Sequence, residues 1–560
     1  MKKNKFLLII LLWGLFLGTL QSCSDDDKVH IGSPDVTFNN GSGEYKVKIG
    51  KEITLKAKIK DAVNPVYSWK INGEIVSTDT TFLFFGKQIG ESFVNFRLDA
   101  DNGSIEKQVK ISVVEKALPV VSINGSLAPF AGIDYPIAPA VENSEGASYL
   151  WRVDGKVSGT DSVLIFNQPE AGEYQLALTV KNEDGEAVYI NKVMVLSVIE
   201  AQLIFSDGRY RIPTDNRIPK FTVPQGRKLV LSPTTFGISP NAVYEWSVDG
   251  TVQNEKSVFF TFEPTQQKTY RLKVSVKEGG KTVFAEADIT CTEPEETHRR
   301  TITASSSAKI IDIFEYIPAP NQFNSYQIGS TFTQALNDAR SILTNESYTF
   351  LGAYGGYIVM GFDHSVENKE GEYDLEINGN AFSGNSEPAI VWVMQDENGD
   401  GLPNDTWYEL KGSAIPEQTT RQYAITYYKP KETRTNVIWV DNEGKTGSVD
   451  INSYHSQDYY FPMFIQGNSY TLYGTKLAPL TENVGGIWYN RDYEWGYVDN
   501  YGTNKDCFDI GNAVQRDGTP IKLKYIDFVM VQTGISSKAE NIGELSTECC
   551  AAYDYHLKNK

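Results

Sequence analysis

The sequence predicts an all-β fold in which three small tandem β-sandwiches precede a larger, jelly-roll-like β-sandwich. Three observations lead to this prediction. One short motif occurs three times at the spacing of a small sandwich, and apolar and polar residues alternate after each copy. Residues 310–560 contain many short apolar runs separated by turn residues, together with one helical pattern.

The repeated motif has the pattern Tyr-x-Trp-x-(Ile/Val)-(Asn/Asp)-Gly and begins at Tyr67, Tyr149 and Tyr244. On a strand, its Tyr, Trp and β-branched residues share one face, so the Trp can enter a sandwich core. The Asn-Gly or Asp-Gly pair then supplies the positive φ angles of a tight hairpin turn.

The modules built on this motif resemble PKD-type immunoglobulin-like domains, which we place at residues 31–115, 116–199 and 200–292. Such folds host many functions, so the fold alone names none of them. We expect all three modules to act as a stalk. The alternative is that one of them binds a partner.

The chain changes character after the third module. Residues 293–309 are rich in Thr, Ser, Glu and Pro, which is typical of a linker. Residues 310–560 form the predicted ligand-binding domain, in which apolar residues at helical spacing predict an amphipathic helix over Thr331–Leu343. Runs of β-branched and aromatic residues predict strands at Tyr357–Met360, Ile390–Met394, Tyr423–Tyr428, Asn436–Val440 and Tyr525–Val531.

The N-terminus predicts export and lipid anchoring. Lysines precede an apolar run, Phe6–Leu20, that is too short to span a bilayer, so residues 1–22 are expected to be a signal peptide. Leu20-Gln-Ser-Cys23 resembles a lipobox, which implies that Cys23 carries the lipid anchor; an ordinary signal peptide is the alternative. Residues 23–30 form an acidic tether that resembles the surface-export signal of Bacteroidetes lipoproteins. This implies an outer-membrane location facing the exterior, with a tether facing the periplasm as the alternative.

Charge and motif content argue against several classes of function. The formal charge of −19 speaks against a nucleic-acid partner, because phosphate binding needs clustered Lys and Arg. No second apolar run is long enough to cross a membrane, so we expect attachment by the lipid anchor. The sequence lacks a Gly-x-Ser-x-Gly elbow, a phosphate-binding loop and an HExxH motif. We therefore expect a non-enzymatic protein without a catalytic cofactor. The alternative is an enzyme in which Asp492 and Glu494 form a carboxylate pair suited to glycoside hydrolysis.

A loop of oxygen-bearing residues predicts a structural calcium site. Aspartate and asparagine side chains occupy positions 1, 3 and 5 of a calcium-loop pattern, and a backbone carbonyl stands at position 7. Trp407 replaces the usual Glu, so Asp405 or Glu409 is expected to complete the shell. The predicted ligands are Asp396, Asn398, Asp400, Leu402 (through its carbonyl) and Asp405. The alternative is a hairpin turn that holds itself together by side-chain-to-backbone hydrogen bonds.

Two aromatic segments, residues 454–461 and 488–501, predict a binding surface. Consecutive aromatic residues on a strand point to opposite faces, so some of these rings must be exposed or line a cleft. Tyr and Trp offer a large, stiff contact area, and polar neighbours can orient a bulky ligand. The predicted ligand-binding residues are Tyr454, His455, Asp458, Tyr459, Trp488, Tyr489, Arg491, Tyr493 and Trp495. For any single ring, packing into a sandwich core is the alternative.

Several motifs within residues 345–556 are similar to those of one family of bacterial surface proteins. In chain order they are Gly355–His364, Asn378–Phe382, Ser386–Leu410, Trp495–Asn500, Phe508–Ile510, Ile526–Val529 and Gly543–Glu548. With PKD-like modules before this domain, the chain resembles the cobamide (vitamin B12)-capture lipoproteins of Bacteroidetes, which work beside TonB-dependent transporters. The resemblance implies that the C-terminal domain binds a cobamide and delivers it to such a transporter. Residues 539–542 depart from the pattern, because a Trp-containing turn is expected there.

Two other functions stay open on the sequence alone. A glycan-binding surface lipoprotein is one, because aromatic platforms also stack on sugar rings. An adhesin or structural surface protein is the other. A cobamide suits the aromatic segments because its corrin ring is bulky, mostly uncharged and rimmed by amides that Tyr, Trp, Asn and Gln can match.

Overall fold

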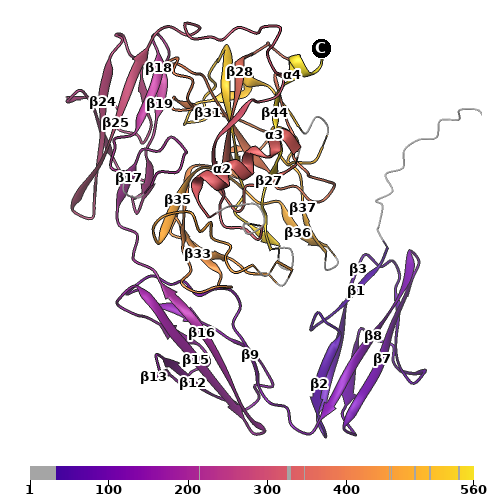
Figure 1. The fold of residues 1–560 in the computed structure, drawn as a ribbon. Coiled ribbons are helices and arrows are strands. Elements are labelled where there is room, and N and C mark those ends of the chain that lie inside the picture. Colours follow the sequence, from indigo (N-terminus) through magenta and orange to yellow (C-terminus); the bar gives the residue numbers. More distant parts are fainter. Residues whose placement is uncertain are drawn as a thin grey trace, which may run out of the picture. The chain divides into compact units, whose positions relative to one another are not determined.

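The computed structural model describes residues 33–212, 215–323, 330–345, 347–452, 454–455, 457–484, 487–502, 506–539 and 543–560. The predicted signal peptide, Cys23 and the acidic tether lie outside these residues. Strands dominate the described chain and its helices are few and short, which confirms the all-β prediction (Figure 1). Across these residues we find no helix with the length and apolarity that a membrane span requires. The chain divides into two compact units, residues 1–117 and 118–560.

The first unit is a two-sheet sandwich, module 1. Its small sheet has the order β1 (Asp35–Phe38), β3 (Glu52–Lys60) and β6 (Thr81–Phe85). Its large sheet has the order β2 (Glu44–Lys48), β8 (Gly103–Val114), β7 (Gly90–Ala100), β4 (Val66–Ile71) and β5 (Glu74–Ser77). The apolar residues that alternate along these strands meet between the two sheets and form the core.

The repeated motif folds alike in all three modules. Its tryptophans, Trp69, Trp151 and Trp246, are fully buried, and each indole N–H donates to a backbone carbonyl at 2.8–2.9 Å. The hairpin residues Asn72, Asp154 and Asp249 have φ angles of 47–50°, and the glycine after each also has a positive φ. The predicted turn is thereby confirmed, because a positive φ at both central residues is what a type I′ hairpin requires.

Replacing the central tryptophan of module 1 is expected to unfold this module alone. Trp69→Ala removes a fully buried indole and leaves a cavity, at a cost of about 3–5 kcal/mol in the free energy of unfolding. Calorimetry of the full chain should show one transition moving to lower temperature while the transition of residues 118–560 stays in place. Val66→Ala, at a side chain that is 69% exposed, is the matched control and should shift neither transition.

The second unit begins with module 2. Its main sheet has the order β13 (Lys156–Gly159), β12 (Ser148–Val153), β15 (Gly172–Asn182) and β16 (Gly185–Val195). The opposing layer consists of two pairs, β10 (Tyr135–Ile137) with β14 (Leu164–Phe166), and β9 (Val120–Ser122) with β11 (Ala140–Glu142). Ala128 and Leu196 at the end of this module pack on Ile438 and Val440 of the C-terminal body.

Module 3 follows the same plan. Its main sheet has the order β18 (Lys220–Pro224), β25 (Lys281–Thr292), β24 (Thr269–Glu278), β21 (Tyr244–Val248) and β22 (Thr251–Val252). Two further pairs cover it, β17 (Gln202–Ile204) with β20 (Thr234–Phe236), and β19 (Leu229–Leu231) with β23 (Phe260–Phe262).

The C-terminal body is built on two larger sheets. The first has the order β26 (Asp312–Ile317), β28 (Tyr357–Glu367), β40 (Tyr525–Thr533), β30 (Ala389–Met394), β31 (Trp407–Leu410) and β39 (Ala513–Val514). The second has the order β34 (Thr446–Val449), β33 (Val437–Asp441), β32 (Thr419–Tyr428) and β35 (Ser469–Leu477). Strands β28, β30 and β40 are buried on both faces, which explains why they are rich in apolar residues.

Shorter elements surround these sheets. One further sheet has the order β38 (Cys507–Phe508), β29 (Leu375–Ile377) and β44 (Ala552–Asp554). Three strand pairs are β27 (Thr349–Phe350) with β43 (Glu548–Cys549), β36 (Thr481–Val484) with β37 (Ile487–Asn490), and β41 (Lys538–Ala539) with β42 (Gly543–Glu544). The helical elements are α2 (Phe332–Arg340), α3 (Ile342–Asn345), α4 (Tyr555–Lys558), η1 (Pro416–Gln418) and η2 (Ile510–Asn512).

The predicted amphipathic helix is confirmed as α2, which packs beside β26 (Figure 1). Thr331 caps it, because its hydroxyl accepts the backbone N–H of Gln334 at 3.2 Å. Ala335 and Ala339 are the buried residues of its inner face. The chain turns at Ser341 and continues as the short helix α3.

Module 3 and the C-terminal body share one hydrophobic core. Hydrogen bonds cross between them: Thr222 and Thr406 exchange backbone and hydroxyl bonds of 2.6–3.1 Å, and the backbone N–H of Tyr210 donates to the Tyr357 hydroxyl at 2.7 Å. Buried polar bonds of this kind fix two surfaces in one register. The structure therefore ties module 3 to the C-terminal body along a buried junction.

Charged groups also lie in this junction. Arg227 of module 3 pairs with Glu397 and with Glu295, each at 2.8 Å, and the Glu397 side chain is fully buried. Residues 293–309, predicted as a linker, pack against the body, where Arg300 binds Asp527 at 2.9 Å. We call Arg227, Glu295 and Glu397 the junction cluster.

Candidate functional site

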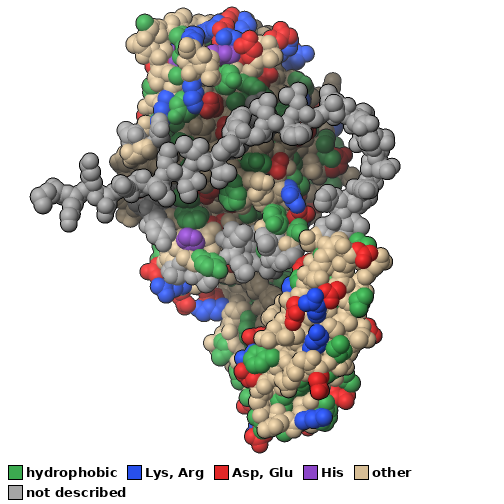
Figure 2. Space-filling model, turned by 90° about the vertical axis from the view of Figure 1, so that its right-hand side faces the viewer, with side chains coloured by type: hydrophobic (Ala, Val, Ile, Leu, Met, Phe, Trp, Pro, Cys, Tyr) green, Lys and Arg blue, Asp and Glu red, His purple; other side chains and the backbone are tan. Residues whose placement is uncertain are grey.

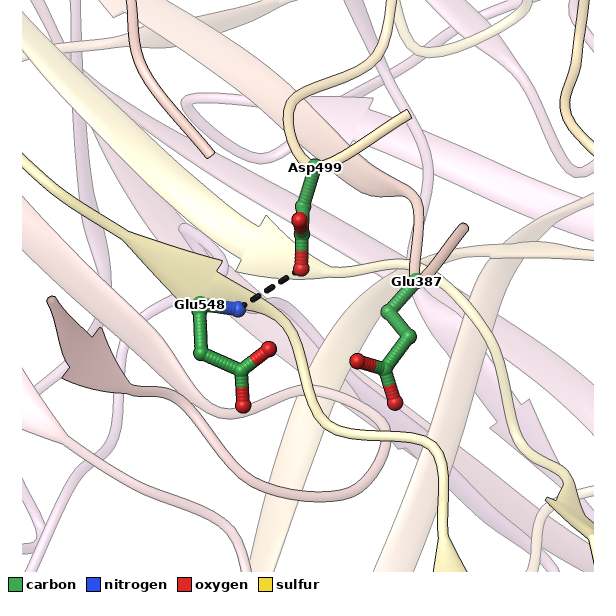
Figure 3. A group of neighbouring side chains, drawn as sticks. All are labelled: Glu387, Asp499 and Glu548. Atoms are coloured by element: carbon green, nitrogen blue, oxygen red, sulfur yellow. Dashed lines mark hydrogen bonds between the residues drawn. The ribbon is translucent and has the colours of Figure 1, made fainter. Parts of the chain in front are cut away.

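Three carboxyl groups meet inside the C-terminal body. Glu387 stands just before β30, Asp499 lies in the loop after Tyr497, and Glu548 begins β43. One oxygen atom of each lies within 4.8 Å of the other two, and Figure 3 shows the three groups pointing toward one another. Backbone N–H groups hold them in place: that of Glu548 donates to Asp499 at 2.9 Å, and that of Ser546 donates to Glu387 at 2.9 Å. We call these three residues the carboxylate triad.

Burial and mutual repulsion favour the protonated form of the triad. Burial raises the pKa of Glu387 to about 7. Burial and the Glu387 charge raise the pKa of Asp499 well above its usual value. Burial, with the charges of Glu387 and Asp499, does the same to the pKa of Glu548. Such a group relieves its repulsion by taking up protons, or by holding a hard cation, whose preferred ligands are carboxylate oxygens.

Neutralising one triad member is expected to stabilise the body at high pH. A carboxyl whose pKa is higher in the folded state than in the unfolded state contributes most to the free energy of unfolding at pH values below its unfolded-state pKa. That contribution is lost as the pH rises toward the folded-state pKa. Glu548→Gln removes one repelling charge, so in buffer with EDTA it should gain up to roughly 3 kcal/mol over wild type at about pH 8 and little at about pH 4. Urea unfolding at both pH values measures this. The exposed Glu370→Gln is the control, and a loss of stability in Glu548→Gln at high pH would contradict the account.

The first predicted aromatic segment connects to the triad through Phe350 and Phe323. Glu548 pairs with Phe350 across the β27–β43 ladder. The Phe350 ring stacks on Phe323 at 4.2 Å between centroids, and Phe323 meets the His455 ring edge-to-face at 4.8 Å. Neighbouring Tyr454 is 75% exposed. A row of rings therefore runs from the triad to the surface at the segment that begins with Tyr454.

The second predicted aromatic segment connects to the triad through Ser386. Ser386, next to Glu387, donates its backbone N–H to Asn490 at 3.1 Å and accepts that of Tyr501 at its hydroxyl at 3.0 Å. Asn490 ends β37, which carries Trp488 and Tyr489. The Tyr489 ring lies against Gly384, where an added Cβ atom would stand 2.7 Å from it. Gly384 thus leaves the space that this ring occupies.

We group the rings of the two segments and their neighbours near the triad under one name, the aromatic face. Its members are Phe323, Phe350, Phe382, Tyr454, His455, Tyr459, Trp488, Tyr489 and Tyr501. Phe382 and Tyr501 are 62% and 42% exposed, so large apolar rings reach solvent there. On the face of the molecule drawn in Figure 2, acidic and basic side chains are interspersed among apolar ones. Exposed apolar rings such as those of Phe382 and Tyr501 suit contact with a partly apolar guest.

The structure places the other predicted ligand-binding residues differently. Tyr493 is a core residue: its ring packs on Tyr497 at 5.1 Å, and its hydroxyl donates to the Ala478 carbonyl at 2.6 Å. Arg491 pairs with Glu482 and Asp458 with Arg434, each at the surface. Trp495 lines a separate hollow in the C-terminal body.

The predicted calcium loop is held by its own hydrogen bonds. Asp396 accepts the backbone N–H groups of Asp400 and Gly401 at 3.0–3.1 Å, and the Asp400 carboxylate accepts that of Leu402 at 2.9 Å. Asp405 is buried and accepts the N–H of Glu397 at 2.8 Å, while Asn398 bonds to Asn404. This is the geometry of the Asx-rich hairpin turn. Calcium binding by the loop stays a prediction.

The carboxylate triad was missed because its members are far apart in the sequence and each resembles an ordinary surface acid. One signal points to it: Glu387, Asp499 and Glu548 all fall within the motifs that carry the family resemblance. Acidic residues within such motifs were a reason to expect a shared site.

Of the cysteines in the described residues, Cys549 and Cys550 are both buried free thiols.

The fold and the site define a multi-module β-sandwich protein with exposed aromatic rings near a carboxylate triad. A family model described as a PKD-like domain matches residues 33–102 and 123–182. No curated protein matches the chain. Tandem PKD-like, immunoglobulin-like modules fit an adhesive or structural surface protein, and such β-sandwich modules are typically non-catalytic.

Solved structures with similar parts are immunoglobulin-like and fibronectin-like modules. Extracellular domains 3–5 of Drosophila OTK are 11% identical, with 46% of this chain and 97% of that chain covered and a TM-score of 0.18. The fibronectin(III)-like modules of Clostridium thermocellum CbhA are 18% identical, with 29% and 94% covered and a TM-score of 0.15. Three N-terminal domains of the Hoc protein of bacteriophage RB49 are 14% identical, with 47% and 99% covered and a TM-score of 0.16. These scores are too low for the likeness to carry an argument about function.

Proposed function

We propose that this chain is a non-enzymatic outer-membrane lipoprotein, anchored through Cys23 and exposed at the cell surface. Its C-terminal body binds a cobamide at the aromatic face and passes it to a TonB-dependent transporter. One observation supports the proposal above the others. Two aromatic segments, separated in the sequence, connect to the same carboxylate triad, one through Phe350 and the other through Ser386, and both keep exposed rings at the surface.

The chemistry of the aromatic face matches that of a corrin. A corrin is broad, mostly uncharged and rimmed by amides, so it needs apolar contact area and scattered hydrogen-bonding groups rather than a charged patch. The rings of Tyr454, Tyr489 and Tyr501 offer such area together with phenol hydroxyls. Asn452 lies at the start of the first segment, where its side chain accepts the backbone N–H groups of Tyr454 and His455 at 2.9–3.0 Å.

Module 1 serves the proposed function as a spacer. It is a compact unit of its own, and its sandwich core closes without residues from the rest of the chain. A chain of such modules keeps a lipid-anchored binding body away from the membrane. The acidic tether extends this spacer toward the anchor.

Substitutions in the aromatic face test the proposal. Tyr454→Ala, Tyr459→Ala and Trp488→Ala should each weaken cyanocobalamin binding by about tenfold, the loss expected for one large contact ring. Isothermal titration of the full chain measures it, with unfolding midpoints confirming that each variant folds. Phe284→Ala, at a 56% exposed ring of module 3, is the matched control and should bind as wild type does. Equal affinity for cyanocobalamin in all four variants would show that the aromatic face is not the cobamide-binding site.

A further inference from the structure

A separate hollow of about 660 Å³ opens in the C-terminal body. Its wall includes Tyr373, Trp495 and Tyr555, together with the polar side chains of Glu372, Asp509 and Asn512. Of the predicted ligand-binding residues, Trp495 is the one that lines it. We call it the second pocket, to distinguish it from the aromatic face.

Aromatic rings stand on its wall at the surface. Tyr373 and Trp495 are 38% and 39% exposed, and the Tyr373 and Tyr555 rings meet at 6.1 Å between centroids and 67° between planes. The negative face of an aromatic ring attracts the weakly positive C–H groups of a sugar ring. Exposed rings held at an angle offer such a platform.

The backbone holds Trp495 in place. Its N–H donates to the Ser413 hydroxyl at 3.1 Å and its carbonyl accepts the Ser413 N–H at 3.0 Å. Gly496 and Gly412 pack so closely that a Cβ atom on Gly496 would stand 2.5 Å from the Gly412 Cα. Because this loop is fixed by its backbone, the ring is preorganised, which lowers the entropy cost of binding.

Planar polar groups accompany the rings. Asn512 ends η2, and its carbonyl accepts the Lys411 N–H at 3.1 Å, while its side-chain amide has no hydrogen-bond partner among the described residues. Asp509 caps η2 by accepting the Gly511 N–H at 2.6 Å with one oxygen, and Glu372 is a second carboxylate in the lining. An amide and a carboxylate each offer two adjacent hydrogen-bonding atoms, which match two neighbouring hydroxyl groups.

We propose that the second pocket binds a neutral sugar ring, such as one unit of a surface glycan. Stacking on Trp495 and Tyr373 supplies contact area, and Asn512 with the two carboxylates orients the hydroxyls. A cationic guest fits less well, because an aromatic cage must hold a cation within about 6 Å of its rings and Lys411 stands on this wall. The proposal is independent of cobamide binding at the aromatic face.

The test is a titration of the full chain with neutral trisaccharides: maltotriose, cellotriose, chitotriose, mannotriose and xylotriose, followed by saturation-transfer NMR. We expect at least one of them to bind with millimolar affinity. Trp495→Ala and Tyr373→Ala should each weaken it by about tenfold or more, and Asn512→Leu should do so without removing a ring. Tyr454→Ala, in the aromatic face, is the control and should leave sugar binding unchanged.

The opposite results would overturn the proposal. Absence of binding by every trisaccharide would do so, as would sugar binding that survives both ring substitutions. Loss of cyanocobalamin binding in Tyr373→Ala would assign the second pocket to the cobamide instead. All variants alter exposed or half-buried side chains, and equal unfolding midpoints confirm that each is folded.

Discussion

A chain that lacks residues 200–292 is expected to have no cooperatively folded C-terminal body. Module 3 supplies one wall of the shared core, and its removal exposes apolar residues that the intact chain buries. It also removes one hydrogen-bond partner from Tyr357, the partner of Thr406 and the arginine that pairs with the buried Glu397. Lost apolar burial and stranded polar groups both cost free energy, so their sum exceeds the 5–15 kcal/mol by which a typical protein is stable.

Circular dichroism and urea unfolding of three chains test this expectation. Residues 293–560 alone should show no cooperative transition, whereas residues 200–560 should unfold cooperatively. Deletion of residues 1–117 is the matched control, since it removes a unit with its own core. A cooperative transition in residues 293–560, at the midpoint of the longer chain, would show that the junction is dispensable.

Breaking the junction cluster at one residue is expected to have the next largest effect. Arg227→Ala leaves Glu397 buried without its partner, which costs about 3–5 kcal/mol when the carboxyl stays charged. Burial raises the pKa of Glu397 to about 8, so a proton can replace the lost arginine in mildly acidic solution. A raised folded pKa gives a contribution that is lost as pH rises through that value, so the penalty should grow with pH.

Urea unfolding of Arg227→Ala at about pH 6 and about pH 9 measures this dependence. The deficit relative to wild type should be small at the lower pH and largest at the higher one. Arg217→Ala, whose side chain is 85% exposed, should differ little from wild type at either pH. A deficit that shrinks with rising pH would mean that Glu397 is not the group left unpaired.

Local signals made the modules predictable. The tryptophan, the alternating strand and the Asn-Gly or Asp-Gly turn lie within a few residues of one another, so each copy of the motif specifies a hairpin by itself. The apolar runs within β28, β30 and β40 predicted strands because strands buried on both faces are rich in apolar residues. The cap at Thr331 and the apolar stripe after it likewise specify α2.

The junction could not be predicted in this way. Arg227 follows Gly226 in a short turn, which reads as a solvated loop, and residues 293–309 have the composition of a linker. These residues become buried only because module 3 packs against the C-terminal body. A local sequence pattern does not predict such a contact between two domains. The carboxylate triad has the same origin, since its residues converge from three separate parts of the body.

The aromatic segments were predictable as a class but not ring by ring. Alternation on a strand indicates that some rings face solvent. It does not indicate which rings do so where the segment continues beyond the end of the strand. Tyr493 lies beyond β37, where the chain turns inward and places its ring in the core. Trp495, two residues later, faces the second pocket instead of the aromatic face.

The central claim is that the aromatic face receives a cobamide. Isothermal titration of the full-length wild-type chain with cyanocobalamin tests it most directly. The account predicts saturable binding of one cobamide per chain, with the negative heat-capacity change that accompanies burial of apolar rings. A flat titration of a protein shown to be folded would contradict it.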